Sequence, residues 1–544
     1  MRKTIEAKSS AGKNISRKDT FKYKLLLEGI IVGAISGLVI AGLRVLLVKA
    51  DEMRNATVSW LTGSQGSMPV KVAIIAAMLI AVAFVISLLL KWEPECAGSG
   101  IPQVEGELKG QMDMSWGKVI VSKVAGCVLA IGGGLALGRE GPSVQLGAMV
   151  GKGVAKCRHR LLTEERLLIT CGAGAGLSAA FGAPLAGAIF ALEELHKTFS
   201  TLVLITTMAS AAISDWVASN IVGRTPVFDV SVEHVLPLKY YWALIIMGIA
   251  LGVIGFIYNR TLNTMQDIFA KLGNLVPARY SSFIRLLAMF ALALVMMFVY
   301  PVVLGSGGGL VAEICTGKFA LEALLLLLLV KFVYSTGSFG SGAPGGIFLP
   351  LLVLGALTGG LFSRVLTACF GISDQYITSF VVIAMAGMFA AIVRAPATGI
   401  ILITEMTGSF TCLLALVTVS LISYVVADAL GAEPVYEQLW NKRIGKTRLE
   451  LDEEEANRKT IIEGDVQMAS NAEGMSVQEL GLPGGCLIVA LIRDGEEIIP
   501  SGRTRLKAGD HLEILCKQRD IDETEQILEE KCMKYNSSNT QKTE

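Results

Sequence analysis

Three glycine-rich motifs carry the residue types that could bind an anion. They read Gly98-Ser-Gly-Ile-Pro102, Gly138-Arg-Glu-Gly-Pro142 and Gly345-Gly-Ile-Phe-Leu-Pro350, and each stands at the end of an apolar segment. Glycine permits a close approach of the backbone, and proline suits the first turn of a helix. A helix start presents unpaired N–H groups and the positive end of the helix dipole. Several such starts pointing into the centre of a membrane would form an anion site without a full positive charge.

The chain contains an internal duplication of roughly 200 residues. Gly98-Ser-Gly100 recurs as Gly305-Ser-Gly307, at an offset of 207 residues. Further identities recur at offsets of 208 and 212 residues, and in the first half they are Gly138, Pro142, Leu146, Gly147, Ala148, Gly151, Ala179, Ala183, Pro184, Gly187, Ile189 and Glu193. One Gly-Pro cluster alone is explained by a helix break for packing. Three clusters at repeat-related positions favour the anion site.

Glu140 is an acid at one of these expected helix starts. An ionised carboxylate there resembles a bound anion and would block the path, whereas the protonated form loses that attraction and can swing away. A capping acid would also explain a glutamate beside a helix start. The equivalent residue in the second half is Phe348. An acid on only one side of a duplicated framework favours a functional role that links proton binding to anion access.

An acidic pair ends a later apolar segment. Glu193 aligns with Glu405 in the second half, whereas Glu194 aligns with Met406. The duplicated Glu193 is therefore the better candidate for a structural role, and the unmatched Glu194 is the better candidate for a functional one. An acid this close to hydrocarbon is costly unless it is functional or solvated.

The elements that position these residues are expected to be membrane helices. Of the 544 residues, 52% are hydrophobic and 17% are charged, whereas average soluble domains carry about 25% charge. About seven apolar segments occur in each half, and many reach the ~20 residues that a helix needs to cross a bilayer. Others are short and interrupted by glycine or proline, which indicates broken helices. An odd number of crossings in each half would invert one half relative to the other, as is typical of transporters.

Composition divides the chain into six parts. In chain order we expect a cytoplasmic N-terminal segment at 1–24, a first membrane repeat at 25–222, a second membrane repeat at 238–440, a linker at 441–459, a small domain at 460–531 and a disordered tail at 532–544. The first 24 residues hold eight basic residues and two acids. They lack the apolar core of a signal peptide, and the positive-inside rule keeps them cytoplasmic. Short strand-like runs between 486 and 516, followed by an acidic helix near 520–533, predict an α+β fold for the small domain.

Several functions find no support in the sequence. The net charge of +1 argues against a nucleic-acid partner. The ten cysteines form no CxxC pair and the four histidines form no spaced cluster, so we expect no metal, no disulfide framework and no cofactor. A membrane-embedded enzyme would need a nucleophile or metal constellation, and none is found. Arg394, in apolar surroundings, is expected to pair with a carboxylate.

The three motifs, in this order, resemble the signature sequences of the CLC chloride channels and chloride/proton antiporters. The resemblance covers about residues 25–440. It implies an all-α polytopic membrane protein with an inverted repeat and broken helices, which forms a homodimer with a separate pore in each subunit. It also implies that the helix starts along the anion path are formed by Gly98, Gly100, Pro102, Gly138, Arg139, Gly141, Pro142, Gly345 and Gly346.

The resemblance further implies a chloride-binding site. Ser99 resembles the family serine whose hydroxyl binds the central chloride, and Tyr436 is placed like the tyrosine whose phenol completes that site. Ile347 and Phe348 match the pair whose backbone amides contact the ion. The alternative for Tyr436 is a tyrosine at the membrane interface. Lys123 matches a buried lysine that raises the potential along the anion path.

Two acids decide between transport mechanisms. Glu140 resembles the gating glutamate of the family, and Glu194 matches its intracellular proton glutamate. Channels of the family lack that second acid and most proton-coupled members keep it, so the sequence favours an antiporter over a passive, gated chloride channel. The fluoride-exporting branch departs from the serine motif and the tyrosine, so Ser99 and Tyr436 argue against fluoride. Chloride and protons are the expected substrates, and nitrate or bromide would fit the same site.

The C-terminal domain resembles a TrkA C-terminal (RCK C) domain. The matching segments are Gly474-Met-Ser-Val-Gln-Glu-Leu480, Ile488-Val-Ala-Leu-Ile-Arg-Asp-Gly495 and Leu506-Lys-Ala-Gly-Asp510. Such domains dimerise and bind small ligands, so we expect residues 460–531 to bind a regulatory ligand such as a cyclic dinucleotide. A dimerisation module without a ligand is the alternative. The resemblance implies a bacterial inner (plasma) membrane protein with both termini in the cytoplasm. A ligand sensor that uses its membrane part only as a platform would leave the anion motifs unexplained.

Overall fold

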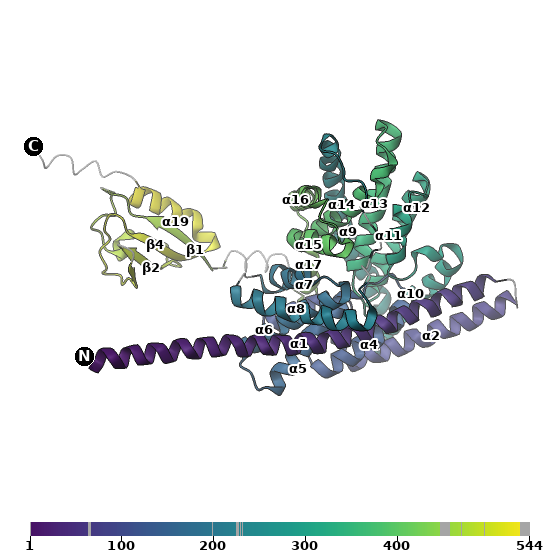
Figure 1. Ribbon diagram of the computed structural model, residues 1–544, viewed down its shortest axis with the longest axis horizontal. Coiled ribbons are helices and arrows are strands. Elements are labelled where there is room, and N and C mark those ends of the chain that lie inside the picture. The colour runs from purple at the N-terminus through teal and green to yellow at the C-terminus, as the bar shows by residue number, and fades with distance from the viewer. Residues whose placement is uncertain are drawn as a thin grey trace, which may run out of the picture. The chain divides into compact units, whose positions relative to one another are not determined.

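The chain forms two compact units, Met1–Trp440 and Asn441–Glu544. The computed structural model describes residues 2–63, 67–197, 200–224, 228, 230, 232–445, 457, 459–468, 470–493 and 496–533. Figure 1 shows the first unit as a set of packed helices and the second as a small sheet with a helix. The predicted fold class, a helical membrane part followed by a small α+β domain, is confirmed.

In the described part of the chain, each half of the first unit contains eight α-helices in the same order. The first half consists of α1 (Arg2–Thr62), α2 (Met68–Trp92), α3 (Ile101–Leu108), α4 (Trp116–Gly132), α5 (Glu140–Cys157), α6 (Leu162–Phe181), α7 (Pro184–Phe190) and α8 (Thr201–Val222), with the 3-10 turn η1 (Pro94–Cys96) and the π-helix η2 (Ala191–His196). The second half consists of α9 (Tyr241–Asn274), α10 (Ala278–Val299), α11 (Gly308–Cys315), α12 (Leu321–Gly340), α13 (Phe348–Phe370), α14 (Ile377–Val393), α15 (Pro396–Thr407) and α16 (Leu413–Ala429), with the 3-10 turns η3 (Leu238–Tyr240), η4 (Pro301–Val303) and η5 (Asp374–Tyr376). Helix α17 (Val435–Ile444) follows.

Two of these helices correct the sequence prediction. The short helices α3 and α11 lie outside the seven apolar segments expected in each half. Each has eight residues and follows a glycine-rich loop, so neither produces an apolar run long enough to be recognised. Helix α1 also begins at Arg2, inside the segment 1–24 that was separated from the membrane repeat. Hydropathy marks where a membrane helix becomes apolar, and the hydrogen-bonded helix extends beyond that point.

The two halves are inverted relative to each other. Helices α7 and α15 occupy equivalent places in the duplication and pack against one another. Glu193, at the end of the α7 segment, accepts hydrogen bonds from the start of α15, and Glu405, in the last turn of α15, accepts hydrogen bonds from the start of α7. Two helices whose ends meet in this crossed way run antiparallel. The inversion expected from the duplication is therefore present.

Small residues let the helices of each half pack closely. The same pairings occur in both halves: α5 packs on α6 and α13 on α14, while α1 packs on α8 and α9 on α16. A Cβ atom at Gly359 of α13 would stand 2.5 Å from the carbonyl oxygen of Phe380 in α14. Close backbone approach of this kind is typical of helix contacts in membranes. Eight of the described helices are long and apolar enough to cross a membrane by length and composition.

Glu28 of α1 and Trp440 of α17 lie on one face of the first unit. Glu28 of α1 accepts hydrogen bonds of 2.6–3.2 Å from Arg160, which follows the C-terminal end of α5. Near the same end of α5, Lys152 binds Asp113 at 2.5 Å. Trp440 of α17 donates to Gln111 at 2.9 Å, two residues before that aspartate. We call this the α17 face.

The second unit is a four-stranded antiparallel sheet with strand order β1-β4-β2-β3. Its elements are β1 (Lys459–Asp465), η6 (Val477–Leu480), β2 (Leu487–Arg493), β3 (Glu496–Ile498), β4 (His511–Lys517), η7 (Gln518–Asp520), α19 (Ile521–Leu528) and the π-helix η8 (Glu529–Met533). Its apolar core includes Leu491, Leu512, Ile514 and Leu528. The buried Asp510 accepts two hydrogen bonds of 2.7 Å from Arg493.

The borders of the second unit differ slightly from those expected. Strand β1 was not predicted, and it begins at Lys459, inside the expected linker. The expected strands and the acidic helix correspond to β2, β3, β4 and α19–η8. Of the expected linker, residues 446–456 and 458 lie outside the described residues, and of the expected tail 532–544, residues 534–544 do.

Candidate anion site

The three glycine-rich motifs meet through their backbones. Gly138 and Gly346 exchange two N–H···O=C hydrogen bonds of 2.7 Å, which form an isolated antiparallel bridge between the two halves. Gly345 donates to the carbonyl oxygen of Gly98 at 3.0 Å. The loop before α3 and the starts of α5 and α13 are thus joined at one place, although about 40 to 250 residues separate them in the sequence.

Each motif ends in a helix start, as the sequence predicts. Helix α3 begins directly after Gly100 and has Pro102 in its first turn. Helix α5 begins at Glu140, with Arg139 before it and Gly141 and Pro142 following. Gly100 has φ +95°, a left-handed conformation that glycine adopts without strain.

Ser99 lies against the start of α5. A Cβ atom at Gly141 would stand 2.8 Å from the carbonyl oxygen of Ser99, so only glycine allows this approach. Ser99 is 2% exposed, and its hydroxyl oxygen has no hydrogen-bond partner. A buried, unsatisfied hydroxyl beside unpaired helix N–H groups is a site where a dehydrated anion would replace the missing partner.

Glu140 is completely buried at the first position of α5. Its Oε2 atom accepts a long hydrogen bond of 3.4 Å from the backbone N–H of Leu349, in the first turn of α13. Its Oε1 atom has no partner. The carboxylate therefore lies at the starts of two helices from opposite halves, where a negative charge is favoured by both dipoles.

Phe348 takes the place in α13 that Glu140 takes in α5. Its ring is fully buried and contacts Phe389, Phe181 and Phe190, with centroid distances of 4.6, 5.3 and 6.5 Å. Ile347 is the residue before the first turn of α13. The second half therefore supplies an apolar wall and backbone amides where the first half supplies an acid.

Tyr436 lies in the first turn of α17, and its phenol is fully buried without a hydrogen-bond partner. The charges of both Glu194 and Glu140 act on this phenol. A tyrosine at the membrane interface would keep its hydroxyl in water, so burial argues against that alternative. Ser99, Glu140 and Tyr436 each contribute a buried oxygen that lacks a partner.

Glu194 lies in the π-helix η2, beside a pocket of about 430 Å³. We call this the Glu194 pocket; its lining comprises Glu193, Glu194, Lys197, Arg394, Tyr424, Asp428, Gly431, Ala432, Glu433 and Pro434. Glu194 is 6% exposed. Lys197, at the end of η2, pairs at 3.3 Å with both Glu105 of α3 and Glu437 of α17. Single π-helical turns are frequent at functional sites.

Glu193 and Glu405 act as crossed helix caps. The two carboxylate oxygens of Glu193 accept hydrogen bonds from the N–H groups of Ala397 at 3.2 Å and Thr398 at 2.7 Å, and from the Thr398 hydroxyl at 2.7 Å. Glu405 accepts from the N–H groups of Leu185 at 3.1 Å and Ala186 at 2.8 Å. These contacts agree with the structural role expected for the duplicated Glu193.

Sequence reasoning singled out Lys123 and missed its repeat partner. Lys123 is fully buried and donates to the carbonyl oxygens of Cys96 at 3.1 Å and Gly98 at 2.7 Å. Lys331 is also fully buried and donates in the same way to Val303 at 2.8 Å and Gly305 at 2.9 Å. The offset of 208 residues that aligns the second motif also aligns these two lysines, so the duplication could have identified Lys331.

Arg394 pairs with a carboxylate, as expected. Its guanidinium donates to Asp428 and to the carbonyl oxygen of Tyr424, and it lies 4.3 Å from the centre of the Tyr424 ring. Its φ of +73° matches the φ of +68° at Gly182, which holds the equivalent place after α6.

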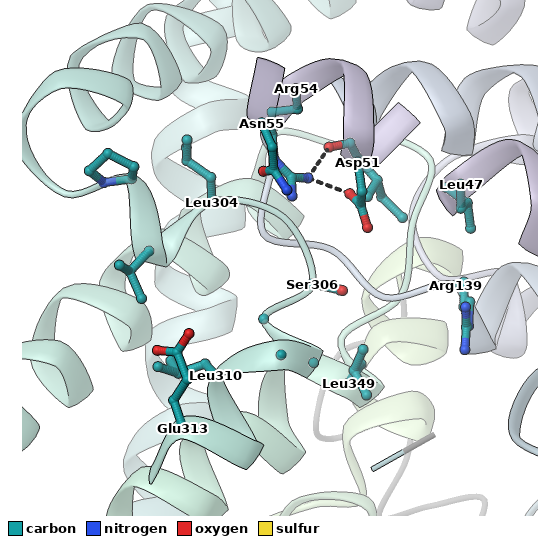
Figure 2. Close-up of a pocket in the computed structure, with 16 residues that line it drawn as sticks. Leu47, Asp51, Arg54, Asn55, Arg139, Leu304, Ser306, Leu310, Glu313 and Leu349 are labelled. Carbon is teal, nitrogen blue, oxygen red and sulfur yellow. Dashed lines mark hydrogen bonds and ion pairs between the residues drawn. The ribbon is translucent and has the colours of Figure 1, made fainter. Parts of the chain in front are cut away.

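A second pocket, of about 460 Å³, borders the site from the end of α1. We call it the Ser306 pocket. Figure 2 shows Ser306 between the Arg54–Asp51 ion pair of α1 and Leu349, with Arg139 on another side. Leu349 provides the backbone N–H that binds Glu140. The Ser306 pocket therefore reaches the wall behind Glu140, whereas the Glu194 pocket lies beside α17.

The two repeats are inverted, and helix starts from both of them surround buried oxygens, with a pocket on either side. This arrangement is typical of membrane proteins of the ion-transport class. The sequence profile described as voltage gated chloride channel matches residues 78–428, and the TrkA-C domain profile matches residues 464–529. The chain belongs to the voltage gated chloride channel (CLC) family and carries a C-terminal TrkA-C domain.

Relatives and solved structures agree with this assignment. A protein of Vibrio parahaemolyticus described as H(+)/Cl(-) exchange transporter ClcA is 33% identical over 448 residues, which cover 81% of this chain and 94% of the relative. The protein of the same description from Vibrio cholerae serotype O1 is 34% identical over 444 residues, with coverages of 80% and 92%. The crystal structure of a slow cyanobacterial Cl⁻/H⁺ antiporter matches with a TM-score of 0.72 and 29% identity, over 78% of this chain and 98% of that one. A CLC-type fluoride/proton antiporter shares the fold, with a TM-score of 0.62 and 21% identity over 76% of this chain and 98% of that one.

Proposed function

We propose that the chain is a chloride/proton antiporter, and therefore a transporter and not an enzyme. The observation that carries the proposal is the set of buried, unpartnered oxygens of Ser99, Glu140 and Tyr436 beside helix starts from both halves. The relatives described as H(+)/Cl(-) exchange transporters, which match four fifths of the chain, support the same substrates.

Chloride binds between Ser99 and Tyr436 in this proposal. Both hydroxyls are free to donate to an anion, and the backbone N–H groups of Ile347 and Phe348 lie at the start of α13, where the helix dipole favours negative charge. All these donors are neutral. An anion held by neutral donors is bound strongly enough to lose water and weakly enough to leave again.

Glu140 and Glu194 carry the proton in this proposal. Ionised Glu140 competes with chloride for the starts of α5 and α13, and protonation releases it from both helix dipoles. Glu194 receives protons from the aqueous side through the Glu194 pocket. In this proposal the proton and anion routes pass close together at the buried phenol of Tyr436.

The membrane orientation follows from charge. We propose a multi-pass protein of the bacterial inner (plasma) membrane, with both termini in the cytoplasm. The basic segment 1–24 leads within α1 to Glu28, which shares the α17 face with Trp440 of α17. By the positive-inside rule the α17 face is cytoplasmic. The Glu194 pocket then opens inward and the Ser306 pocket outward.

The regulatory proposal concerns the second unit. We propose that the chain works as a homodimer and that residues 460–531 bind a small cytosolic ligand, such as a cyclic dinucleotide, which changes the exchange rate. The TrkA-C match supports a regulatory domain. A ligand can bias transport by no more than its difference in affinity between two arrangements of the dimer. Adding candidate nucleotides to liposomes that contain the full chain, and to a variant that lacks residues 460–544, tests this part separately.

A flux assay in liposomes tests the main proposal. Purified full-length protein is reconstituted, an outward chloride gradient is imposed, and chloride efflux and proton uptake are recorded together. Chloride efflux that drives protons inward against their gradient is the expected result. Chloride flux without proton movement, with a reversal potential at the chloride equilibrium value, would identify a passive channel instead.

Two substitutions connect the assay to the site. Glu140→Gln should abolish proton movement and leave chloride flux, because a neutral amide neither competes as an anion nor carries a proton. Glu194→Gln should also abolish proton movement, while the neighbouring Glu193→Gln serves as the matched control that keeps it. Proton coupling that survives Glu140→Gln would refute the assigned role of this residue.

A further inference from the structure

One face of the sheet in the second unit is left exposed. Side chains alternate between the two faces of a strand, and the apolar core of the domain lies on the face that carries Leu512 and Ile514. On the opposite face, Ile461 of β1 is 54% exposed and Leu487 of β2 is 64% exposed. Leu515 of β4 lies between them, in register with both. The side chains of Ile461, Leu515 and Leu487 therefore form a line across three strands, and we call this line the apolar row.

Like charges flank the apolar row on both sides. At a distance of two residues from the apolar row in one strand direction, Lys459 of β1 is paired in register with Lys517 of β4. At the same distance in the opposite direction, Glu463 of β1 is paired in register with Glu513 of β4. All four residues have the strand parity of the apolar row, so they share its face. Like charges directly opposite each other on neighbouring strands destabilise a sheet, and this face contains two such pairs.

A second copy of the same face matches this pattern. When two copies face each other and are related by a two-fold axis along the apolar row, each aliphatic residue meets its own counterpart. The same rotation reverses the strand direction, so Lys459 and Lys517 of one copy come to lie over Glu463 and Glu513 of the other. Every like-charge pair then gains two opposite charges. A two-fold axis along the strands would place lysine over lysine, so charge selects the first arrangement.

We propose that the sheet face formed by the apolar row, the lysine pair and the glutamate pair binds the same face of a second copy of this chain. This inference rests on the homodimer proposed above. In a homodimer the two domains are tethered to one assembly, so a small interface is sufficient because the effective concentration of the second domain is high.

Leu515 provides the test because the proposed axis passes beside it. Leu515→Cys is made in the full chain, and the protein in membranes is treated with a bifunctional thiol reagent that spans about 10 Å. Sheets that face each other pack about 10 Å apart, which is too far for a direct disulfide, so a reagent of about that length is needed to join the two cysteines across the axis. The unsubstituted chain, with its ten cysteines, is the blank. Met468→Cys, at a position 80% exposed outside the face, is the matched control. Only Leu515→Cys should give a covalent dimer.

Charge exchange tests the orientation. On the Leu515→Cys background, Lys459→Glu with Lys517→Glu should slow cross-linking about tenfold, and so should Glu463→Lys with Glu513→Lys, because each change sets like charges against each other in four places. Combining all four changes should restore the original rate. Each variant keeps like charges paired across β1 and β4, but Glu463 also lies 3.8 Å from His511, so thermal unfolding of each variant is measured to control for effects on the domain itself.

The outcomes separate the two proposals. Sedimentation of the purified chain reports whether the homodimer exists at all. A dimer in sedimentation without cross-linking of Leu515→Cys would overturn the proposed interface and leave the homodimer standing; this is also the result if the face binds the membrane unit or lipid. A monomer in sedimentation would overturn both. Cross-linking that the fourfold exchange fails to restore would overturn the proposed axis.

Discussion

The crossed caps at Glu193 and Glu405 allow a stability prediction with a worked magnitude. In Glu193→Gln one carboxylate oxygen becomes an NH₂ group, so one of the contacts with Ala397 and Thr398 changes from acceptor–donor to donor–donor. Losing one charge-assisted hydrogen bond costs about 1.5–3 kcal/mol. Losing the charge at a helix start costs about 0.3–1 kcal/mol more. We therefore expect Glu193→Gln to destabilise the membrane unit by about 2–4 kcal/mol.

Glu405→Gln should cost about the same, because it removes one of two equivalent contacts at the start of α7. Helix α15 has 12 residues and is therefore about 18 Å long. The two caps lie at opposite ends of the α7–α15 pair and share no partner. Their effects should add within about 0.5 kcal/mol in the double variant.

Thermal unfolding of the purified protein, at one fixed scan rate, measures these effects. For a unit of this size, a loss of about 2–4 kcal/mol should lower the unfolding temperature by about 2–4 °C. Glu194→Gln is the control, because Glu194 caps neither helix, and it should unfold within about 1 °C of the unsubstituted protein. The roles of the two residues would be reversed if Glu193→Gln unfolded normally and lost proton coupling while Glu194→Gln kept it.

Three further changes have distinct expected results. Gly141→Ala should reduce chloride flux at least tenfold, because its methyl group would stand 2.8 Å from the carbonyl oxygen of the serine at the anion site, whereas Gly117→Ala, with nothing within 4 Å, should leave flux unchanged. Burial alone would raise the pKa of Asp510, but hydrogen bonds from its arginine partner and a backbone N–H lower this pKa below 3.8. Asp510→Asn should therefore speed hydrogen exchange of the β4 amides at neutral pH. In acid, once the native carboxyl is protonated, the variant and the unsubstituted chain should exchange alike. The hydrogen bond to Asp465 raises the pKa of His511 above 6.5, so this pair should protect β4 amides fully below pH 6.5 and lose that protection as pH rises through the raised pKa. A His511→Gln variant that exchanges like the unsubstituted chain below pH 6.5 would contradict this last expectation.

The duplication explains why much of the membrane unit could be predicted from sequence. Identities at a fixed offset placed Glu140 and Phe348 at equivalent helix starts, and the structure begins α5 and α13 at these residues. The same comparison separated Glu193 from Glu194 before their contacts were known. A repeat gives each residue an internal reference, so a departure from the repeat is visible without any other sequence.

Other features depend on distances that a sequence does not contain. Helices α3 and α11 are too short to form an apolar run, and their positions follow from left-handed glycines at residues such as Gly100 and Gly307. The π-helical turn at Glu194 has no distinct residue pattern. Burial of Tyr436 without a partner depends on how α17 packs against the rest of the unit. The cross-strand charge pairs of the second unit required the register of β1, a strand that the sequence did not reveal.

The bridge between Gly138 and Gly346 limits how the protein can move. Many transporters with inverted repeats expose their site alternately by rocking one repeat against the other. Here the repeats share two backbone hydrogen bonds at the anion site, a third from Gly345 to Gly98, and the crossed caps at either end of α7 and α15. Rocking would pull apart the crossed caps and would break the backbone bonds at the anion site inside a buried region, where each unmade bond is costly. A small moving part fits this frame, and in the mechanism proposed above it is the carboxylate of Glu140 that turns.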